Sequence, residues 1–241
     1  MDAQILAALV AAAASVVVAL GAAVLTLFQQ RSTSQAKAAA EAAAEKTREL
    51  ERDLALAARL DLSRAPLLAV ARDVSDRLAN IIDGNFLAYV RDQSDPHRQH
   101  RALVSTAFRL ARYWAVLEDL YGTTDLLAFE RAESTQPITE IVNEIGRTFA
   151  SDLRAMGGHR FMIWREEQRA VAELMTRTNE TLLSRRYANF ATFIKRFEPD
   201  FAPWLGPFLD QLVQPDSENS PRLHKLEDLF SSLVRLLEAG R

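Results

Sequence analysis

The stretch ILAALVAAAASVVVALGAAVLTLF, residues 5–28, sets the architecture expected of this chain. It contains no charged residue and no proline, and its most polar members are Ser15 and Thr26. A helix of this length rises by about 36 Å, which is enough to cross a hydrocarbon core of roughly 30 Å. Each of its Val, Leu, Ile and Phe residues favours insertion by roughly 0.3–0.6 kcal/mol. The run therefore predicts a single N-terminal transmembrane helix within residues 1–30.

A cleaved signal peptide is the competing interpretation of this run. Signal peptides begin with a basic segment and have an apolar stretch of about 7–15 residues. Here Asp2 carries the only charged side chain before the run, and the run is longer than that, although small residues suited to cleavage are plentiful. We expect an uncleaved anchor.

The positive charges around the run predict its orientation. No Lys or Arg precedes it, whereas Arg31, Lys37, Lys46 and Arg48 follow it closely. Such charges stay on the cytoplasmic side of a membrane. We therefore expect a single-pass protein of the cell membrane with its C-terminal domain in the cytoplasm, and the absence of cysteine agrees with a reducing compartment.

Small residues recur at every fourth position of the run: Ala7, Ala11, Ser15, Ala19 and Ala23. This spacing lets two helix backbones approach closely, which would allow two copies of the chain to associate. Nearly half of the run is Ala, Gly or Ser, so composition alone also accounts for such a series. Self-association through this face stays open.

Residues 31–63 predict an exposed helical stalk, because Ala, Glu and Arg dominate the segment and are strong helix formers. The segment Arg31–Ser34 is expected to break the helix between anchor and stalk. A sustained coiled coil needs three or four good heptads. Three residues fit a heptad here and two do not: Leu50, Leu54 and Ala57, against Thr47 and Asp61. A dimeric coiled coil is therefore the less favoured alternative to a plain helical spacer.

Residues 64–241 predict one all-α domain, a multi-helix cytoplasmic bundle, since Gly and Pro are scarce and no alternating strand pattern occurs. Its first helix is expected to begin at Pro66 and to end at Asp83–Asn85. Apolar residues at helical spacing predict further helices at about 99–121, from 137, at 164–177, 185–197 and 221–240, with a short proline-marked segment at 199–213. Gly157 and Gly158 are expected to break the chain between two of them.

Four strings of this domain resemble a family of uncharacterised bacterial membrane-anchored all-helical proteins: RAPLL (64–68), residues 73–82, ARYWAVLE (111–118) and FMIWREEQRAVAELM (161–175). The likeness covers about half of the chain, and the last string is its most specific part. The resemblance implies a helical fold and implies no activity.

Two glutamates fall on the apolar faces of their predicted helices. Glu118 lies in line with Ala107 and Ala111, and Glu167 lies among Trp164, Val171, Leu174 and Met175. A buried carboxylate is costly unless it is paired or protonated. We therefore expect Glu118 to be buried and paired with an arginine, Arg77 being the first candidate.

A polar stripe beside the apolar face of the first helix supplies partners for these acids. The resulting candidate binding network is Asp73, Arg77, Asn80, Glu118, Glu167 and Arg169. One interpretation is a ligand or catalytic pocket. The favoured one is a hydrogen-bonded network that fixes helix register. A separate polar arc, Arg101, Ser105, Arg109, Arg112 and Asp119, is expected to be a solvated face rather than a contact with lipid headgroups.

Several function classes lack their sequence signatures. No Glu-x-x-His pair, phosphate-binding glycine loop, dinucleotide fingerprint or nucleophile elbow occurs, so we expect no metal, no cofactor and no catalytic residue. A net charge of −3 offers no basic field for nucleic acid.

The sequence therefore favours a membrane-anchored helical domain that acts by protein–protein interaction or scaffolding rather than by catalysis. Its expected partners are the lipid bilayer, an unidentified protein and a second copy bound through the anchor or the stalk. The alternative is a small-ligand sensor or an enzyme with a polar pocket between helices.

Overall fold

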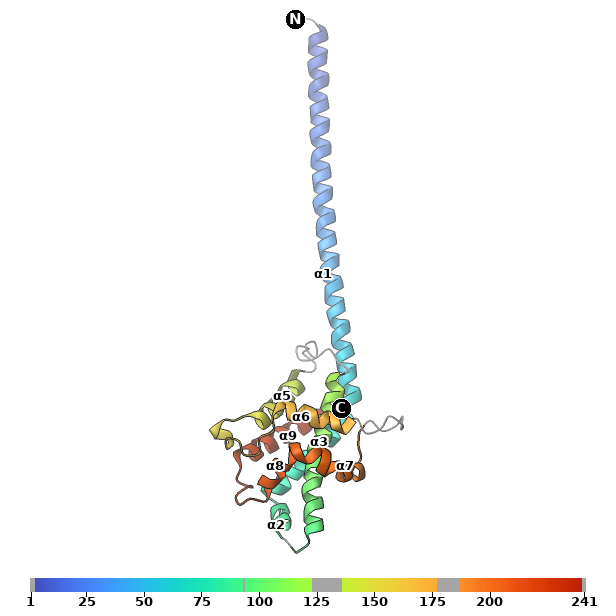
Figure 1. The fold of residues 1–241 in the computed structure, drawn as a ribbon. Coiled ribbons are helices and arrows are strands. Elements are labelled where there is room, and N and C mark those ends of the chain that lie inside the picture. Colours follow the sequence, from blue (N-terminus) through green and yellow to red (C-terminus); the bar gives the residue numbers. More distant parts are fainter. Residues whose placement is uncertain (1–2, 93, 123–135, 177–186, 240–241) are drawn as a thin grey trace. The chain divides into compact units, whose positions relative to one another are not determined.

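The computed structural model of the chain (Figure 1) describes the backbone of residues 3–92, 94–122, 136–176 and 187–239. Within these ranges it describes side chains from residue 37 onward, apart from residues 38–39, 56 and 59–60. Every regular element in the described ranges is a helix, which confirms the all-α class. The chain divides into two units, residues 1–54 and 55–241, while the expected division at residues 30 and 63 stays a prediction.

The described helices follow one another in a simple order. They are α1 (Ala3–Ile82), α2 (Phe86–Arg91), α3 (Pro96–Gly122), α5 (Gln136–Ala150), the 3₁₀ turn η1 (Arg154–Met156), α6 (Arg165–Thr176), α7 (Phe190–Arg196), the π turn η2 (Phe197–Phe201), α8 (Ala202–Leu212) and α9 (Pro221–Ala239).

Helix α1 corrects two predictions about the start of the chain. Its backbone stays helical through Arg31–Ser34, so the break expected there is wrong. It also runs through Pro66 without interruption, so no new helix begins at that residue. Strong helix formers on both sides of Ser32–Ser34 explain the first correction: Leu, Gln and Arg precede these residues, and Ala and Lys follow them. Such residues favour continued helix over a turn.

Pro66 inside α1 is tolerated because of what surrounds it. A proline in a helix interior removes one hydrogen bond and crowds the carbonyl four residues earlier, at a cost of about 3 kcal/mol. Leu62 and Pro66 are both exposed, so water reaches the carbonyl group that loses its donor. Leu67 and Leu68, which follow immediately, are buried and hold this part of the helix on the core.

The core of the second unit forms from the apolar faces that the spacing predicts. The face of α1 is confirmed as buried at Leu67, Val70, Ala71, Val74, Leu78 and Ile81, that of α5 at Ile138, Val142, Ile145 and Phe149, and that of α9 at Leu223, Leu226, Phe230, Leu233 and Leu237. Helix α3 packs against α2, α6, α7 and α8, while α5 packs against α6 and α9 (Figure 1). Helix α3 is therefore the central element to which most of the others attach.

Most helix ends lie near their predicted positions. The turn at Asp83–Asn85 ends α1, α3 stops at Gly122 and α5 begins beside Pro137, as expected. Gly157 and Gly158 have φ of 85° and 62°, left-handed conformations that glycine adopts without steric cost, and they reverse the chain before α6. The helix expected at 185–197 is shorter, because α7 begins at Phe190; residues 185 and 186 lie outside the described ranges.

A π turn joins α7 to α8 where the sequence suggests only a proline-marked segment. Pro199 has no N–H to donate, so one regular α-helical hydrogen bond is missing at this point. The wider turn brings three aromatic residues together: the ring centroid of Phe193 lies 5.9 Å from that of Phe197 and 4.3 Å from that of Phe201. All three are buried, so η2 is part of the core.

A buried arginine holds the loop between α5 and α6. Arg222, the second residue of α9, is fully buried and donates to the carbonyl oxygens of Arg160 at 2.6 Å and Gly158 at 2.7 Å, and to that of Ser151. Burial lowers its pKa below the usual value. Because none of the ion pairs among the described residues includes it, backbone carbonyls take the place of a carboxylate.

Candidate functional site

The polar stripe of α1 meets the polar arc of α3 inside the second unit. Arg109 donates to the main-chain carbonyl of Asp73 at 2.7 Å, and a nitrogen of Arg112 lies 3.5 Å from the Asp73 carboxylate. Arg77 donates to the hydroxyl of Ser105 at 3.1 Å, which in turn donates to a main-chain carbonyl of its own helix. These five residues form the seam network. The expectation of a solvated arc is wrong for the part of α3 that carries Ser105, Arg109 and Arg112.

The seam network is crowded with positive charge. The guanidinium carbon of Arg77 lies 4.1 Å from the ring centroid of Phe86, a stacked arrangement that buries the charge. Burial is the main cause that lowers the pKa of Arg77 to about 10, and the charge of Arg109 acts in the same direction. Each arginine nonetheless has a defined acceptor across the seam, so the network holds α1 in register with α3.

Glu118 is not part of this network. It is exposed, so the expectation of a buried Glu118–Arg77 pair is wrong. Arg77 contacts α3 at Ser105, and the thirteen residues from Ser105 to Glu118 correspond to about 20 Å of helix. A helical wheel gives the side of a helix on which a residue lies, but not whether another helix covers that stretch.

Glu167 and Asn80 have local structural roles. The carboxylate of Glu167 accepts a hydrogen bond from the main-chain N–H of Trp164 at 2.7 Å, which caps the first turn of α6. Trp164 itself lies just before α6 and is 56 % exposed, so it does not share the apolar face with Glu167 as expected. Asn80 is exposed, and its side chain lies against Gly84 in the turn that ends α1.

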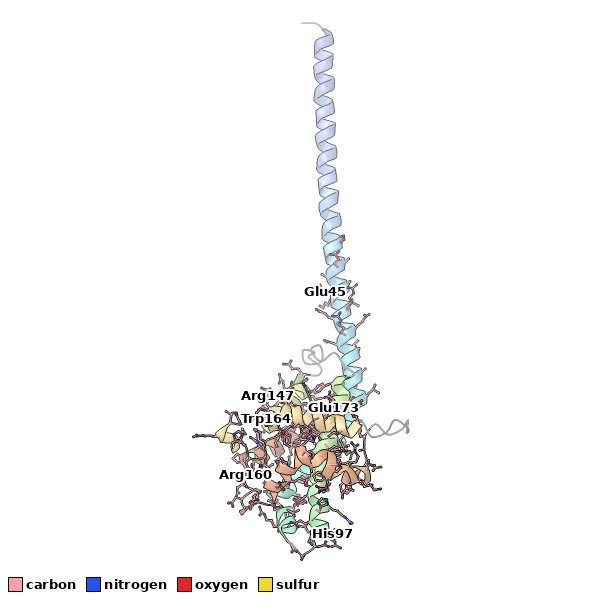
Figure 2. All side chains as sticks on the ribbon, viewed as in Figure 1. Glu45, His97, Arg147, Arg160, Trp164 and Glu173 are labelled. Atoms are coloured by element: carbon pink, nitrogen blue, oxygen red, sulfur yellow. The ribbon has the colours of Figure 1, made fainter. Side chains whose placement is uncertain are left out.

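A cavity of about 490 Å³ lies between the C-terminal half of α3 and α6, with α5 at one side. Its apolar surface comes from Trp114, Leu117 and Ala172, which are all buried. Of the predicted network, Glu118 and Arg169 line this cavity, whereas Asp73, Arg77, Asn80 and Glu167 do not. Glu173 of α6, labelled in Figure 2, also lines it. The predicted six residues therefore separate into a seam, local turns and a cavity.

Arg165 is one of the cavity residues that the sequence interpretation missed. It is the first residue of α6, and it donates to the main-chain carbonyl of Asn143 on α5 at 2.9 Å. A Cβ on Gly146 would lie only 2.6 Å from the guanidinium carbon of Arg165, so the side chain lies directly against this glycine. A glycine in the middle of the amphipathic pattern of α5 was the available signal, because such a residue often marks a close approach.

The electrostatic environment of Arg165 is positive. Burial is the main cause that lowers its pKa, and the charges of Arg147 and Arg169 act in the same direction. Among the described residues, the hydroxyls of Tyr121 and Tyr113 oppose this shift. Within the described part of the chain, no ion pair includes Arg165 or Arg169.

Two buried donors of α3 have no acceptor among the described residues. They are the indole Nε1 of Trp114, a residue that lines the cavity, and the hydroxyl of Tyr113, a residue that does not; burial raises the pKa of Tyr113 well above its usual value. Buried donors of this kind are rare in proteins, where most polar groups are paired.

Where side chains are described, no helical stretch is both long enough and apolar enough to cross a bilayer. The run at residues 5–28, with its small-residue face, lies outside that part of the chain. The same described residues contain no group of three or more His, Cys, Asp and Glu that could hold a metal ion.

No protein-family model, curated protein or solved structure matches the chain. The likeness to bacterial helical proteins, drawn from the four strings, therefore adds nothing on activity.

Proposed function

We propose that this protein is a single-pass membrane protein whose helical C-terminal domain lies in the cytoplasm and acts as a scaffold. The uncharged run at 5–28 and the basic residues that follow it support the anchor and its direction. The second unit supplies a folded body with its own core. The partners of such a scaffold are the bilayer, a protein ligand and a second copy of the chain.

The observation that carries association is an exposed apolar face on α1 within the first unit. Leu50 and Leu54 are 60 % and 63 % exposed and lie four residues apart, hence on one side of the helix. Every residue from 40 to 52 is exposed, so nothing in the described structure covers this face. Burial of each leucine against a second helix would stabilise a complex by about 1.5–3 kcal/mol.

Charge beside this face favours a second copy of the chain in parallel orientation. With Leu50 at position d and Leu54 at position a of a heptad, Lys46 occupies position g and Glu51 the following position e. In a parallel dimer, these two positions face each other across the helices, and here they carry opposite charges. The pattern is short, so we expect the membrane anchor to contribute by raising the local concentration of the two helices.

Cross-linking of the full chain in membranes tests this arrangement. The protein has no cysteine, so a single introduced cysteine is the only reactive thiol. Leu50→Cys should form a disulfide-linked dimer under mild oxidation, whereas Arg52→Cys, which points away from the face, should not. Equal cross-linking at both positions, or none at Leu50→Cys, would exclude the parallel dimer.

A fusion reporter tests the anchor separately. A reporter that is active only in the cytoplasm, placed after Arg241, should be active. Activity of a reporter that works only outside the cytoplasm would reverse the proposed orientation.

The cavity between α3 and α6 favours a second candidate function, a small-ligand sensor or an enzyme with a polar pocket. Its volume lies within the usual range of ligand sites, roughly 300–1,000 Å³. Glu118 and Arg169, two residues of the candidate network, line it. Binding measurements on the cavity variants described below test this candidate.

A further inference from the structure

The lining of the cavity between α3 and α6 is mixed. One side is apolar, formed by Trp114, Leu117 and Ala172, and polar groups converge from α5 and α6. In sites for small molecules, a few well-placed polar groups fix the orientation of a ligand whose remainder lies on apolar surface. The kind of ligand then depends on which of the polar groups is best placed and least satisfied.

The arginines of the cavity are better placed for a ligand, and less satisfied, than its glutamates. Arg165 is half-buried, and no carboxylate lies within ion-pair distance of it or of Arg169 among the described residues. Glu118 and Glu173 also line the cavity, but both are exposed. Water and salt screen exposed charges strongly, whereas a partly buried guanidinium keeps most of its field.

Arg165 is held in place by groups on α5. The main-chain carbonyl of Asn143 accepts one of its five N–H donors, and Gly146 leaves room for the guanidinium where any side chain would collide with it. Gln168, which is buried, donates to the carbonyl oxygens of Gly146 at 3.3 Å and Ile163 at 2.9 Å, and so fixes α6 against the same glycine. The remaining donors of Arg165 are therefore positioned before any ligand arrives.

We propose that this cavity binds a small monocarboxylate with an apolar body, the carboxylate on Arg165 and the body against Trp114, Leu117 and Ala172. Arg–carboxylate pairing supplies strong charge-assisted hydrogen bonds. Inorganic phosphate has no apolar body to cover Trp114, Leu117 and Ala172, so it is disfavoured. The proposal rests on the second candidate function, that the cavity is a ligand site.

The binding test uses the full chain in lipid nanodiscs and the fluorescence of Trp114. The chain has three tryptophans, and Trp164 and Trp204 are 56 % and 38 % exposed. Trp164→Phe with Trp204→Phe therefore leaves Trp114 as the only reporter while sparing the buried core. Phenylacetate and hexanoate should change its emission saturably, whereas phenethylamine and inorganic phosphate should not.

Two variants in this background test the role of Arg165. Arg165→Met should weaken phenylacetate binding by about tenfold or more, because it removes the charge-assisted hydrogen bonds. Gly146→Ala should do the same although every arginine remains, since the new methyl group displaces the guanidinium. That side chain is long and free to move at its end, so Gly146→Ala should leave the melting temperature nearly unchanged.

Arg147→Met is the matched control. It removes the same charge from Arg147, the residue of α5 that follows Gly146, whose side chain pairs with Glu144 and does not line the cavity. Its affinity for phenylacetate should stay within about twofold of the parent value. Unchanged binding in Gly146→Ala would show that Arg165 does not hold the carboxylate.

The outcomes separate the ligand class from the site itself. Saturable binding of phenethylamine or phosphate in place of the carboxylates would overturn the proposed class and retain the cavity as a ligand site. A lack of binding by all four probes would overturn both the inference and the second candidate function. Neither result bears on the cross-linking test of the scaffold.

Discussion

At the scale of single residues, Arg222 combines the deepest burial with the most demanding hydrogen bonding of any charged group that the structure describes. Its three carbonyl acceptors belong to the loop between α5 and α6. If the guanidinium is removed, these acceptors are left unpaired in the interior, and each such group costs about 1–3 kcal/mol.

Arg222→Met should therefore lower the free energy of unfolding by about 3 kcal/mol or more. Arg235→Met, on an exposed position of the same helix, should change it by less than about 0.5 kcal/mol. Chemical denaturation of the two variants measures the difference. Similar stabilities would mean that water replaces the guanidinium at little cost.

The structure reverses the order of stability losses that a helical wheel predicts for Arg109 and Glu118. Arg109→Ala should lower the free energy of unfolding by about 1–3 kcal/mol, because the side chain crosses from α3 to the carbonyl of Asp73. Glu118→Ala, at an exposed position, should change it by less than about 0.5 kcal/mol. Thermal and chemical denaturation of the two variants measure these losses. A larger loss in Glu118→Ala than in Arg109→Ala would mean that Glu118 is buried and paired.

At the scale of elements, periodicity predicts the long helices well and the short ones poorly. Apolar residues recur at helical spacing over several turns of α5 and α9, so the pattern identifies both helices. Helix α2 has only six residues and η2 only five, too few for a period to show. Pro66 misled the prediction because proline suits both the first turn of a helix and, where its surroundings are hydrated, the interior.

Pro66→Ala tests the continuity of α1. The substitution restores one helical N–H and relieves the crowding of the preceding turn, so it should raise the free energy of unfolding by about 1 kcal/mol or more. Pro203→Ala, in the first turn of α8 where proline is well tolerated, should have a smaller effect. A loss of stability in Pro66→Ala would indicate that the helix begins at this residue after all.

The candidate site was only partly predictable for a related reason. The sequence selects Glu118 because it falls on an apolar helix face, and Arg169 as a further member of the polar network, and both line the cavity. Arg165 was not, because its position depends on a contact between α5 and α6 that no single helix pattern contains. Sequence periodicity describes one helix at a time, whereas a cavity arises where neighbouring helices fail to cover each other.

At the scale of the whole molecule, the second unit should fold without the first. All buried apolar side chains of the described residues lie between Leu67 and Leu237. A chain of residues 55–241 should therefore be soluble, strongly helical by circular dichroism and cooperative in thermal unfolding. An insoluble product, or a spectrum dominated by strand, would show that the core depends on residues 1–54.

The π turn at Phe197–Phe201 fixes the number of residues between α7 and α8, and the fold depends on that number. Each residue of an α-helix advances the direction of its side chains by 100°, so deletion of Glu198 would rotate every side chain of α8 relative to α7. Leu205, Phe208 and Leu212, which are now buried, would turn toward water. The deletion should cost far more stability than loss of one residue from the turn at 214–219, a difference that denaturation would measure. Here the number of residues, more than their identity, preserves the fold.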